Sequence, residues 1–180
     1  MSLRTRWINL IYTIATGSRK VRTILTPIVG LSYVLFATMF VIVSFPINRC
    51  LNLSLFPPRP MDIFLSIPLI SVGLLLIFWS QFNFLKVKGT PVPFNPPPKL
   101  VTAGPYAYIR NPMLSGIFIL LFGLGFAFKS ISLLFVFAPL FILINVMEIK
   151  AIEEPELEMR LGKDYLEYKK KTPMFFPKAR

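Results

Sequence analysis

The sequence predicts an all-α fold: a polytopic membrane bundle of about four transmembrane helices, followed by a cytoplasmic C-terminal helix. Hydrophobic residues occupy 54% of the 180 positions and the mean hydropathy is +0.65, well above that of an ordinary soluble domain. The formal net charge is +12, and the charged residues lie outside long apolar blocks. This composition excludes a disordered tail and argues against a water-soluble enzyme or a nucleic-acid-binding module.

The first two apolar blocks are long enough to cross a bilayer. Residues 28–47 carry no charge, and about 20 residues at about 1.5 Å each span the roughly 30 Å of a hydrocarbon core. The block 61–85 is interrupted by Pro68, has an interfacial Trp79 near its end and is followed by Lys86. We therefore expect two transmembrane helices within residues 28–85.

The third apolar block, residues 113–147, is interrupted only by the charge of Lys129. One helix of this length would measure about 52 Å, which is too long for a single crossing. Two shorter helices hinged near residues 129–130 fit better. Glycines in the first arm would let another backbone approach closely, which favours tight helix packing; they are Gly116, Gly123 and Gly125.

The distribution of cations predicts the orientation. Seventeen of the 20 Lys and Arg residues lie in residues 1–27, 86–112 and 148–180. By the positive-inside rule these segments and both termini face the cytoplasm, in a bacterial inner membrane or an endoplasmic-reticulum-type membrane. Residues 1–27 have only a short apolar run and no evident cleavage site, so we interpret them as an amphipathic surface segment rather than a signal peptide. The whole chain, residues 1–180, is predicted to form one membrane domain.

The absence of histidine restricts the possible chemistry. With one cysteine, Cys50, and no histidine, a disulfide framework, a cysteine-based zinc cluster and a Ser-His or Cys-His dyad are excluded. We therefore expect no metal site, and any catalysis must use carboxylates, tyrosines, amides and cations.

Seven of the eight acidic residues lie between positions 148 and 167. Most of them alternate with cations at helical spacing, so Glu156, Glu158 and Glu167 are interpreted as parts of a solvated, salt-bridged helix. Pro155 is tolerated in the first turn of a helix, which places Glu153 and Glu154 at its start, where carboxylates interact favourably with the helix dipole.

Residues 86–112 form the second polar region. Prolines between positions 91 and 98 predict a stiff, extended segment. It leads into Gly104-Pro105-Tyr106 and then Arg110-Asn111-Pro112. Such a rigid, aromatic segment is suited to presenting backbone groups to a ligand, and it is equally suited to a structural connector.

These segments combine into the pattern GPYxxxRxPM, a hydrophobic hairpin, and then EExxLxxxxGxxYxxY. The pattern resembles the integral-membrane methyltransferases typified by isoprenylcysteine carboxyl methyltransferase and the phospholipid N-methyltransferases. The resemblance covers roughly residues 88–177. It implies transfer of a methyl group from the cofactor S-adenosylmethionine to a lipid or prenylated acceptor, at a carboxylate or an amine, within the membrane bilayer.

The resemblance also assigns residues to roles. It places these residues at cofactor-contacting positions: Lys99, Leu100, Val101, Tyr106, Asn111, Pro112, Met113, Leu114 and Glu153. Glu154 is a further candidate for the site. Lys150 or Arg110 would orient the acceptor, although Arg110 could instead pair with a carboxylate or stand as a structural interfacial residue.

Two positions depart from the family pattern. Asn111 stands where the family commonly has histidine, and an amide donates hydrogen bonds but carries no proton near neutral pH. Leu114 replaces a usual tyrosine, which removes one polar or aromatic contact. Both changes bear on the identity of the acceptor more than on methyl displacement, which needs neither side chain.

Two other functions remain open from the sequence. Membrane sterol reductases carry a similar Gly-x-Tyr-x-x-x-Arg-x-Pro loop and a Tyr-rich tail with a nicotinamide cofactor, but such chains usually have more spans. A noncatalytic membrane scaffold that kept the fold would be favoured if Asn111 and Leu114 have emptied the pocket.

Overall fold

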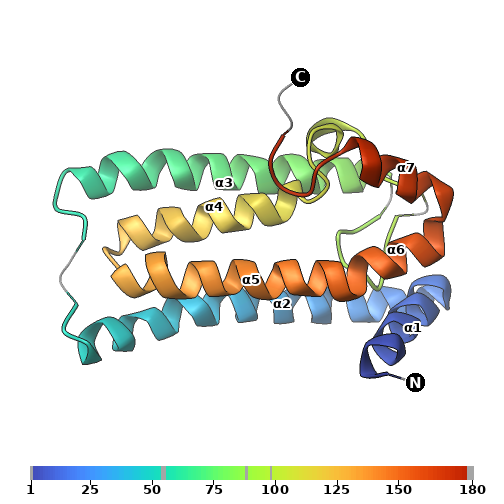
Figure 1. Cartoon of the computed structure of the whole chain (residues 1–180), viewed down its shortest axis with the longest axis horizontal. Coiled ribbons are helices and arrows are strands. Elements are labelled where there is room, and N and C mark those ends of the chain that lie inside the picture. Colours follow the sequence, from blue (N-terminus) through green and yellow to red (C-terminus); the bar gives the residue numbers. More distant parts are fainter. Residues whose placement is uncertain (1, 54–55, 88, 98, 178–180) are drawn as a thin grey trace. The chain divides into compact units, whose positions relative to one another are not determined.

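The computed structural model describes residues 2–53, 56–87, 89–97 and 99–177, and in this part of the chain it has helices and no β-strand. Lys88 and Pro98, which belong to the predicted loop, lie outside the described residues. The elements are α1 (Leu3–Thr16), α2 (Arg19–Cys50), α3 (Met61–Lys86), η1 (Gly104–Ala107), α4 (Pro112–Ala127), η2 (Leu133–Phe137), α5 (Ala138–Glu148), η3 (Ile149–Glu153), α6 (Glu154–Leu161) and α7 (Lys163–Lys171) (Figure 1). The predicted all-α fold is confirmed.

Three helical stretches are long and apolar enough to cross a membrane: Arg19–Cys50, Met61–Lys86 and Leu133–Leu161. The fourth apolar helix, α4, has 16 residues, or about 24 Å. The chain is therefore an integral membrane protein built as a helical bundle. Two of the spans extend past the predicted apolar blocks, because hydropathy locates the bilayer core whereas a helix continues until its backbone is capped or broken.

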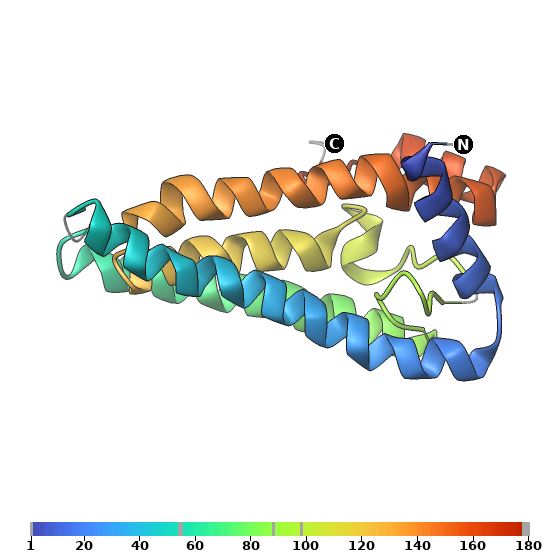
Figure 2. The same ribbon diagram turned by 90° about the horizontal axis from the view of Figure 1, so that it is seen from below.

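The chain divides into two compact units. The bundle unit comprises Tyr33–Phe78 and Met113–Asn145, and the loop unit comprises Met1–Ser32, Trp79–Pro112 and Val146–Arg180. Within the bundle unit, the apolar segments of α2, α3, α4 and α5 run side by side (Figures 1 and 2).

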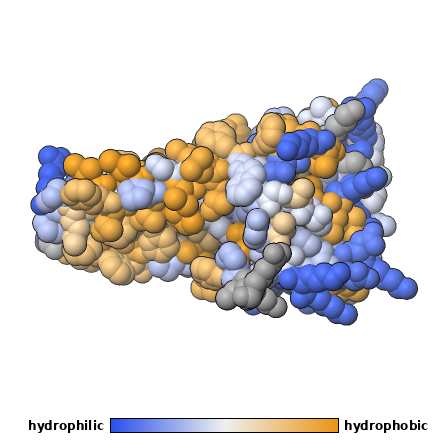
Figure 3. All heavy atoms as spheres, turned by 90° about the horizontal axis from the view of Figure 1, so that it is seen from above, coloured by the Kyte–Doolittle hydropathy of each residue, from blue (hydrophilic) through white to orange (hydrophobic). Residues whose placement is uncertain are grey.

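Phe141 of α5 occupies the centre of the bundle unit and is fully buried. Its ring contacts Phe36 and Phe40 of α2 at centroid distances of 5.5 and 5.2 Å, and Phe118 of α4 at 6.2 Å. Edge-to-face and tilted packing of this kind favours aromatic pairs. Much of the exposed surface of this unit is also apolar (Figure 3), as expected for side chains that face lipid tails.

Helices α3 and α4 approach closely at two glycines. A Cβ atom added to Gly73 would lie 2.8 Å from the carbonyl oxygen of Gly116, and one added to Gly116 would lie 2.7 Å from that of Gly73. Any larger residue would therefore separate the two backbones. Close contacts between small residues hold helices together in a bilayer. There the lipid tails are as apolar as the side chains, so the hydrophobic effect does not drive helices to associate.

The hairpin in the third apolar block turns at Lys129. Helix α4 ends at Ala127, and Lys129 adopts φ +52°. The Lys129 ammonium lies 3.2 Å from the carboxylate of Asp62, at the start of α3. Ser130 then accepts a hydrogen bond from the backbone N–H of Leu133 (3.1 Å), which starts the returning helix.

Helix α1 is a separate amphipathic helix in the loop unit. The Ser2 hydroxyl accepts a hydrogen bond from the N–H of Thr5 (3.2 Å), which caps its start. Ile11 and Ala15 are buried, whereas Leu3 and Trp7 are exposed. The helix thus has one face against protein and another carrying large apolar groups outward, as at a membrane interface.

Candidate functional site

The loop between α3 and α4 enters the site through a tight turn that requires glycine. Gly104 has φ +63°, and a Cβ atom there would lie 2.5 Å from the side-chain nitrogen of Asn83. Pro105 follows at the start of η1, where its missing N–H costs no hydrogen bond. The Gly-Pro pair therefore fixes the direction in which the next residue, Tyr106, points.

Tyr106 is 6% exposed and its ring packs edge-on against Phe84 at 5.3 Å. Its backbone carbonyl accepts a hydrogen bond of 2.7 Å from the hydroxyl of Tyr168 in α7. Burial raises the pKa of both phenols, so both stay neutral across the physiological range. The Tyr168 hydroxyl therefore remains a hydrogen-bond donor that joins α7 to the loop.

Arg110 forms the ion pair at the centre of the loop unit. Its Nη1 atom lies 2.5 Å from Oε1 of Glu154, and the two side chains are only 10% and 7% exposed. The same Nη1 donates to the hydroxyl of Tyr165 at 3.2 Å. Since burial is the main cause that raises the pKa of Tyr165, that hydroxyl stays neutral and accepts this bond.

Glu154 is shared between two cations. Its second oxygen, Oε2, lies 2.6 Å from the ammonium of Lys169, which also lies 2.7 Å from Oε1 of Glu158. The hydrogen bond to Glu154 is the main cause that raises the pKa of Lys169, and the hydrogen bond to Glu158 raises it further. A buried carboxylate thus has charged partners on both oxygens, which offsets the cost of removing it from water.

The end of the loop is also joined to the segment after α7. The backbone N–H of Arg110 donates to the carbonyl of Pro173 (2.8 Å), and that of Asn111 donates to the carbonyl of Met174 (3.1 Å). The side-chain amide of Asn111 reaches the same Met174 carbonyl at 3.5 Å. The loop, α6, α7 and the tail are therefore held together around Arg110.

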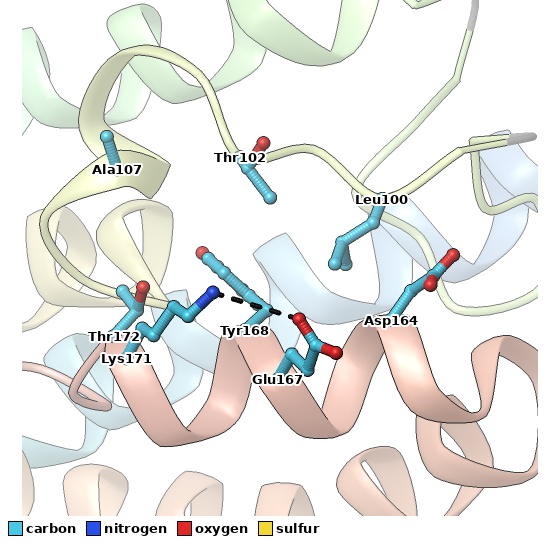
Figure 4. A pocket seen from close by; sticks show the side chains of 8 residues that line it. All are labelled: Leu100, Thr102, Ala107, Asp164, Glu167, Tyr168, Lys171 and Thr172. Carbon is cyan, nitrogen blue, oxygen red and sulfur yellow. Dashed lines mark ion pairs between the residues drawn. The ribbon is translucent and has the colours of Figure 1, made fainter.

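An open pocket of about 450 Å³ lies between the loop and α7 (Figure 4). It is lined by Leu100, Thr102, Ala107, Asp164, Glu167, Tyr168, Lys171 and Thr172. Glu167 and Lys171 pair across one turn of α7 at 3.7 Å. Its walls combine apolar side chains with charged and hydroxyl-bearing ones.

A model of the phospholipid methyltransferase family matches residues 61–164. The chain belongs to this family. The predicted resemblance to integral-membrane methyltransferases of this type is thereby confirmed. The matched segment runs from the start of α3 into α7, and so includes both Arg110 and Glu154.

The chain is also similar to the nickel-cobalt-cadmium resistance protein NccN of Alcaligenes xylosoxydans xylosoxydans. The two are 30% identical over 124 residues, which is 65% of this chain and 54% of NccN. The chain thus spans about half the length of that relative. No solved structure matches the chain. The described residues hold no group of three or more His, Cys, Asp or Glu side chains that could bind a metal ion.

The residues that the sequence predicted for the site do not all lie together in the structure. It brings Arg110 and Glu154 into direct contact, which is the carboxylate pairing left open for Arg110. Glu153 is half-buried and Lys150 is exposed, both on the π-helical turn η3. The other cofactor candidates are distributed as follows: Lys99 is exposed, Leu100 lines the pocket, Val101 and Pro112 are buried, and Met113 and Leu114 begin α4 in the bundle unit.

Three residues of the site had no predicted role. Tyr165 and Tyr168 stood only as letters of the family pattern, and Lys169 was one of a run of lysines. Helical spacing places Tyr165, Tyr168 and Lys169 on one face of α7. That face is the signal that could have identified them.

Proposed function

We propose that this member of the phospholipid methyltransferase family transfers the methyl group of S-adenosylmethionine to a carboxylate or amine of a lipid or prenylated acceptor. The observation that carries the proposal is the buried ion pair between Arg110 and Glu154. It joins the two halves of the methyltransferase pattern, which the sequence separates by a hydrophobic hairpin. The cations on the terminal segments favour a site on the cytoplasmic face.

The residues present fit such a cofactor and acceptor. The Nε atom of Arg110 is buried, and no described residue forms a hydrogen bond with it. A buried guanidinium N–H without an acceptor is costly, and a ligand carboxylate would remove that cost. The Glu153 carboxylate can accept hydrogen bonds from ribose hydroxyls or pair with an ammonium group. The backbone of Leu100 and Val101 can bind polar edges of a ligand in the loop.

The chemistry needs positioning more than acid-base catalysis. When bound, S-adenosylmethionine would supply an electrophilic methyl group together with its leaving group, a neutral thioether. Arg110 would hold an acceptor carboxylate so that one oxygen faces the methyl group, and Glu154 would keep the guanidinium in that orientation. Lys150 is the alternative group for orienting the acceptor. The stiff loop around Tyr106 would exclude water from the reacting atoms.

An amine acceptor, unlike a carboxylate, requires a group that takes up a proton. Its nitrogen must lose a proton to attack, and the Glu153 or Glu154 carboxylate would receive it. Both oxygens of Glu154 already bind a cation, Arg110 on one and Lys169 on the other, so neither is open to receive the proton. Glu153 is therefore the better candidate for an amine, and Arg110 for a carboxylate.

The proposal is tested by binding and by transfer. Purified protein is titrated with S-adenosylmethionine and, separately, with a reduced nicotinamide dinucleotide. Liposomes carrying either a prenylated cysteine or phosphatidylethanolamine then show which acceptor gains a labelled methyl group. Binding of the nicotinamide alone would indicate a reductase, and binding of neither by folded protein would indicate a noncatalytic scaffold.

A further inference from the structure

Helix α1 carries an exposed apolar stripe. Leu3, Trp7 and Leu10 follow one another at helical spacing, so they share one face of α1. All three side chains are exposed, that of Trp7 to 53%. Together with Arg6 they line a shallow groove of about 170 Å³ on the surface of the loop unit. Large apolar side chains gathered on one exposed face indicate a surface that binds lipid or another protein.

Another face of α1 is held against the protein. Ile11 and Ala15 are buried, and Nε of Arg4 donates to the carbonyl of Ala151 in η3 at 2.7 Å. Helix α1 packs against both η3 and α6, and Figure 2 shows it crossing beside them. These contacts fix the rotation of α1 about its axis. The stripe is therefore left on the outside of the loop unit.

The cations of this region have no acidic partner. Residues 1–61 contain no Asp or Glu, whereas residues 1–27 contain five Lys and Arg. Three of these five are exposed and form no ion pair among the described residues: Arg6, Arg19 and Lys20. Nη1 of Arg22 donates to the carbonyl of Ala15 at 3.3 Å, which ties the start of α2 to the end of α1. Arg19 and Lys20 therefore lie at the C-terminal end of α1.

The acids of the neighbouring elements do not neutralise these cations. Helix α6 carries three carboxylates, and each of them already pairs with a cation of the loop, α6 or α7: Glu154, Glu156 and Glu158. Glu153, at the end of η3, is half-buried. Helix α1 and the start of α2 thus combine an apolar stripe with an uncompensated positive charge.

We propose that this region binds anionic phospholipids. The binding surface, called the α1 surface below, consists of Leu3, Arg6, Trp7, Leu10, Arg19 and Lys20. The apolar stripe lies against acyl chains, with Trp7 at the level of the headgroups, and the cations bind lipid phosphates. Each Lys or Arg near an anionic membrane strengthens such binding about fivefold. This inference does not depend on methyl transfer, because it concerns a surface of α1 rather than the site around Arg110.

The test uses the fluorescence of Trp7. The chain has two tryptophans, Trp7 and Trp79, so Trp79→Phe leaves Trp7 as the single emitter. The full-length protein is placed in phosphatidylcholine nanodiscs. These contain the same small fraction of either phosphatidylglycerol or phosphatidylcholine with brominated acyl chains, which quench tryptophan on contact. The ratio of the two binding constants derived from quenching measures the preference for anionic lipid beside α1.

We expect brominated phosphatidylglycerol to be preferred at Trp7 by about fivefold or more at about 0.1 M salt. The preference should disappear at about 1 M salt, where the Debye length is only about 3 Å. Arg6→Gln combined with Lys20→Gln should reduce the preference below about twofold, because two of the three exposed cations are lost. The matched control is Lys163→Gln combined with Lys170→Gln, which removes two exposed charges from α7 and should leave the preference unchanged.

Equal quenching of Trp7 by the two lipids at about 0.1 M salt would overturn the proposal, as would an equal loss of preference in the α7 control. Quenching by neither lipid would also overturn it, and would indicate that another protein surface, such as a second copy of this chain, covers the stripe. Circular dichroism shows whether each variant is folded. If the Arg6 and Lys20 variant fails to fold, the salt dependence of the wild-type surface decides.

Discussion

Glu154→Gln is the substitution that tests the ion-pair network most sharply. It keeps the size of the side chain and removes its charge, so Arg110 loses its anionic partner inside the loop unit. Breaking a buried pair in this way costs about 3–5 kcal/mol, because one charge stays buried and uncompensated. The side chains of Arg110 and Glu154 are 10% and 7% exposed, which places the pair in that class.

The second contact of Glu154 adds little to this cost. Lys169 is 33% exposed, so solvent screens it and the loss of that contact is worth about 0–1 kcal/mol. We therefore expect Glu154→Gln to lower the free energy of unfolding by about 3–5 kcal/mol in all. The assay is reversible unfolding of the purified protein in detergent micelles, followed by circular dichroism.

Glu158→Gln is the matched control for the same assay. Glu158 also pairs with Lys169, but its side chain is 37% exposed, so its loss should cost less than about 1 kcal/mol. In the double variant Arg110→Met with Glu154→Gln, the cost should fall well below the sum of the single costs, since no charge is left unpaired. Equal costs for Glu154→Gln and Glu158→Gln, or additive costs in the double variant, would show that Arg110 and Glu154 do not form a coupled buried pair.

Three further predictions concern the loop and α7. Tyr168→Phe removes the bond to the Tyr106 carbonyl and should cost about 0.5–1.5 kcal/mol in the same unfolding assay; no change would mean that water replaces the hydroxyl. Gly104→Ala should cost at least about 1–2 kcal/mol, because alanine resists the positive φ and its Cβ meets Asn83, and a neutral effect would contradict the assigned turn. The pKa of Lys169 is raised above the ordinary lysine value of 10.5 because its ammonium is paired in the folded protein. The contribution of Lys169 to the free energy of unfolding is therefore fully present below pH 10.5 and is lost as the pH rises through the raised pKa. Wild type should therefore lose more stability than Lys169→Met between about pH 10 and 12, and parallel curves would show that Lys169 contributes nothing.

Much of the bundle could be predicted because a bilayer imposes a simple rule on composition. Uncharged stretches of sufficient length predicted the apolar helices, and Lys129 in the third block indicated the turn that the structure has there. The helix ends were less predictable. The sequence indicated residue 28 as the start of the first span, whereas α2 begins at Arg19, because a charged turn outside the bilayer core remains helical.

The contacts of the site depend on residues far apart in the chain. The pattern singled out Arg110 and Glu154, but their pairing across 44 positions has no local periodicity. The bonds from the backbone of Arg110 and Asn111 to the tail use main-chain atoms, which every residue has. The Nε atom of Arg4 donates to the carbonyl of Ala151, 147 positions away, and nothing in the sequence indicated this contact. Such partners follow from the fold rather than from motif spacing.

Methyl transfer from S-adenosylmethionine at the site built around Arg110 can be measured as transfer of a labelled methyl group into lipid. Liposome-reconstituted protein is incubated with methyl-labelled S-adenosylmethionine and each of the two acceptor lipids, and label in the lipid fraction is counted. We expect wild type to label one acceptor. Arg110→Lys keeps the charge but loses the planar donor geometry, and it should reduce labelling at least about tenfold. Folded wild-type protein that labels neither acceptor and binds no S-adenosylmethionine would contradict the proposed function.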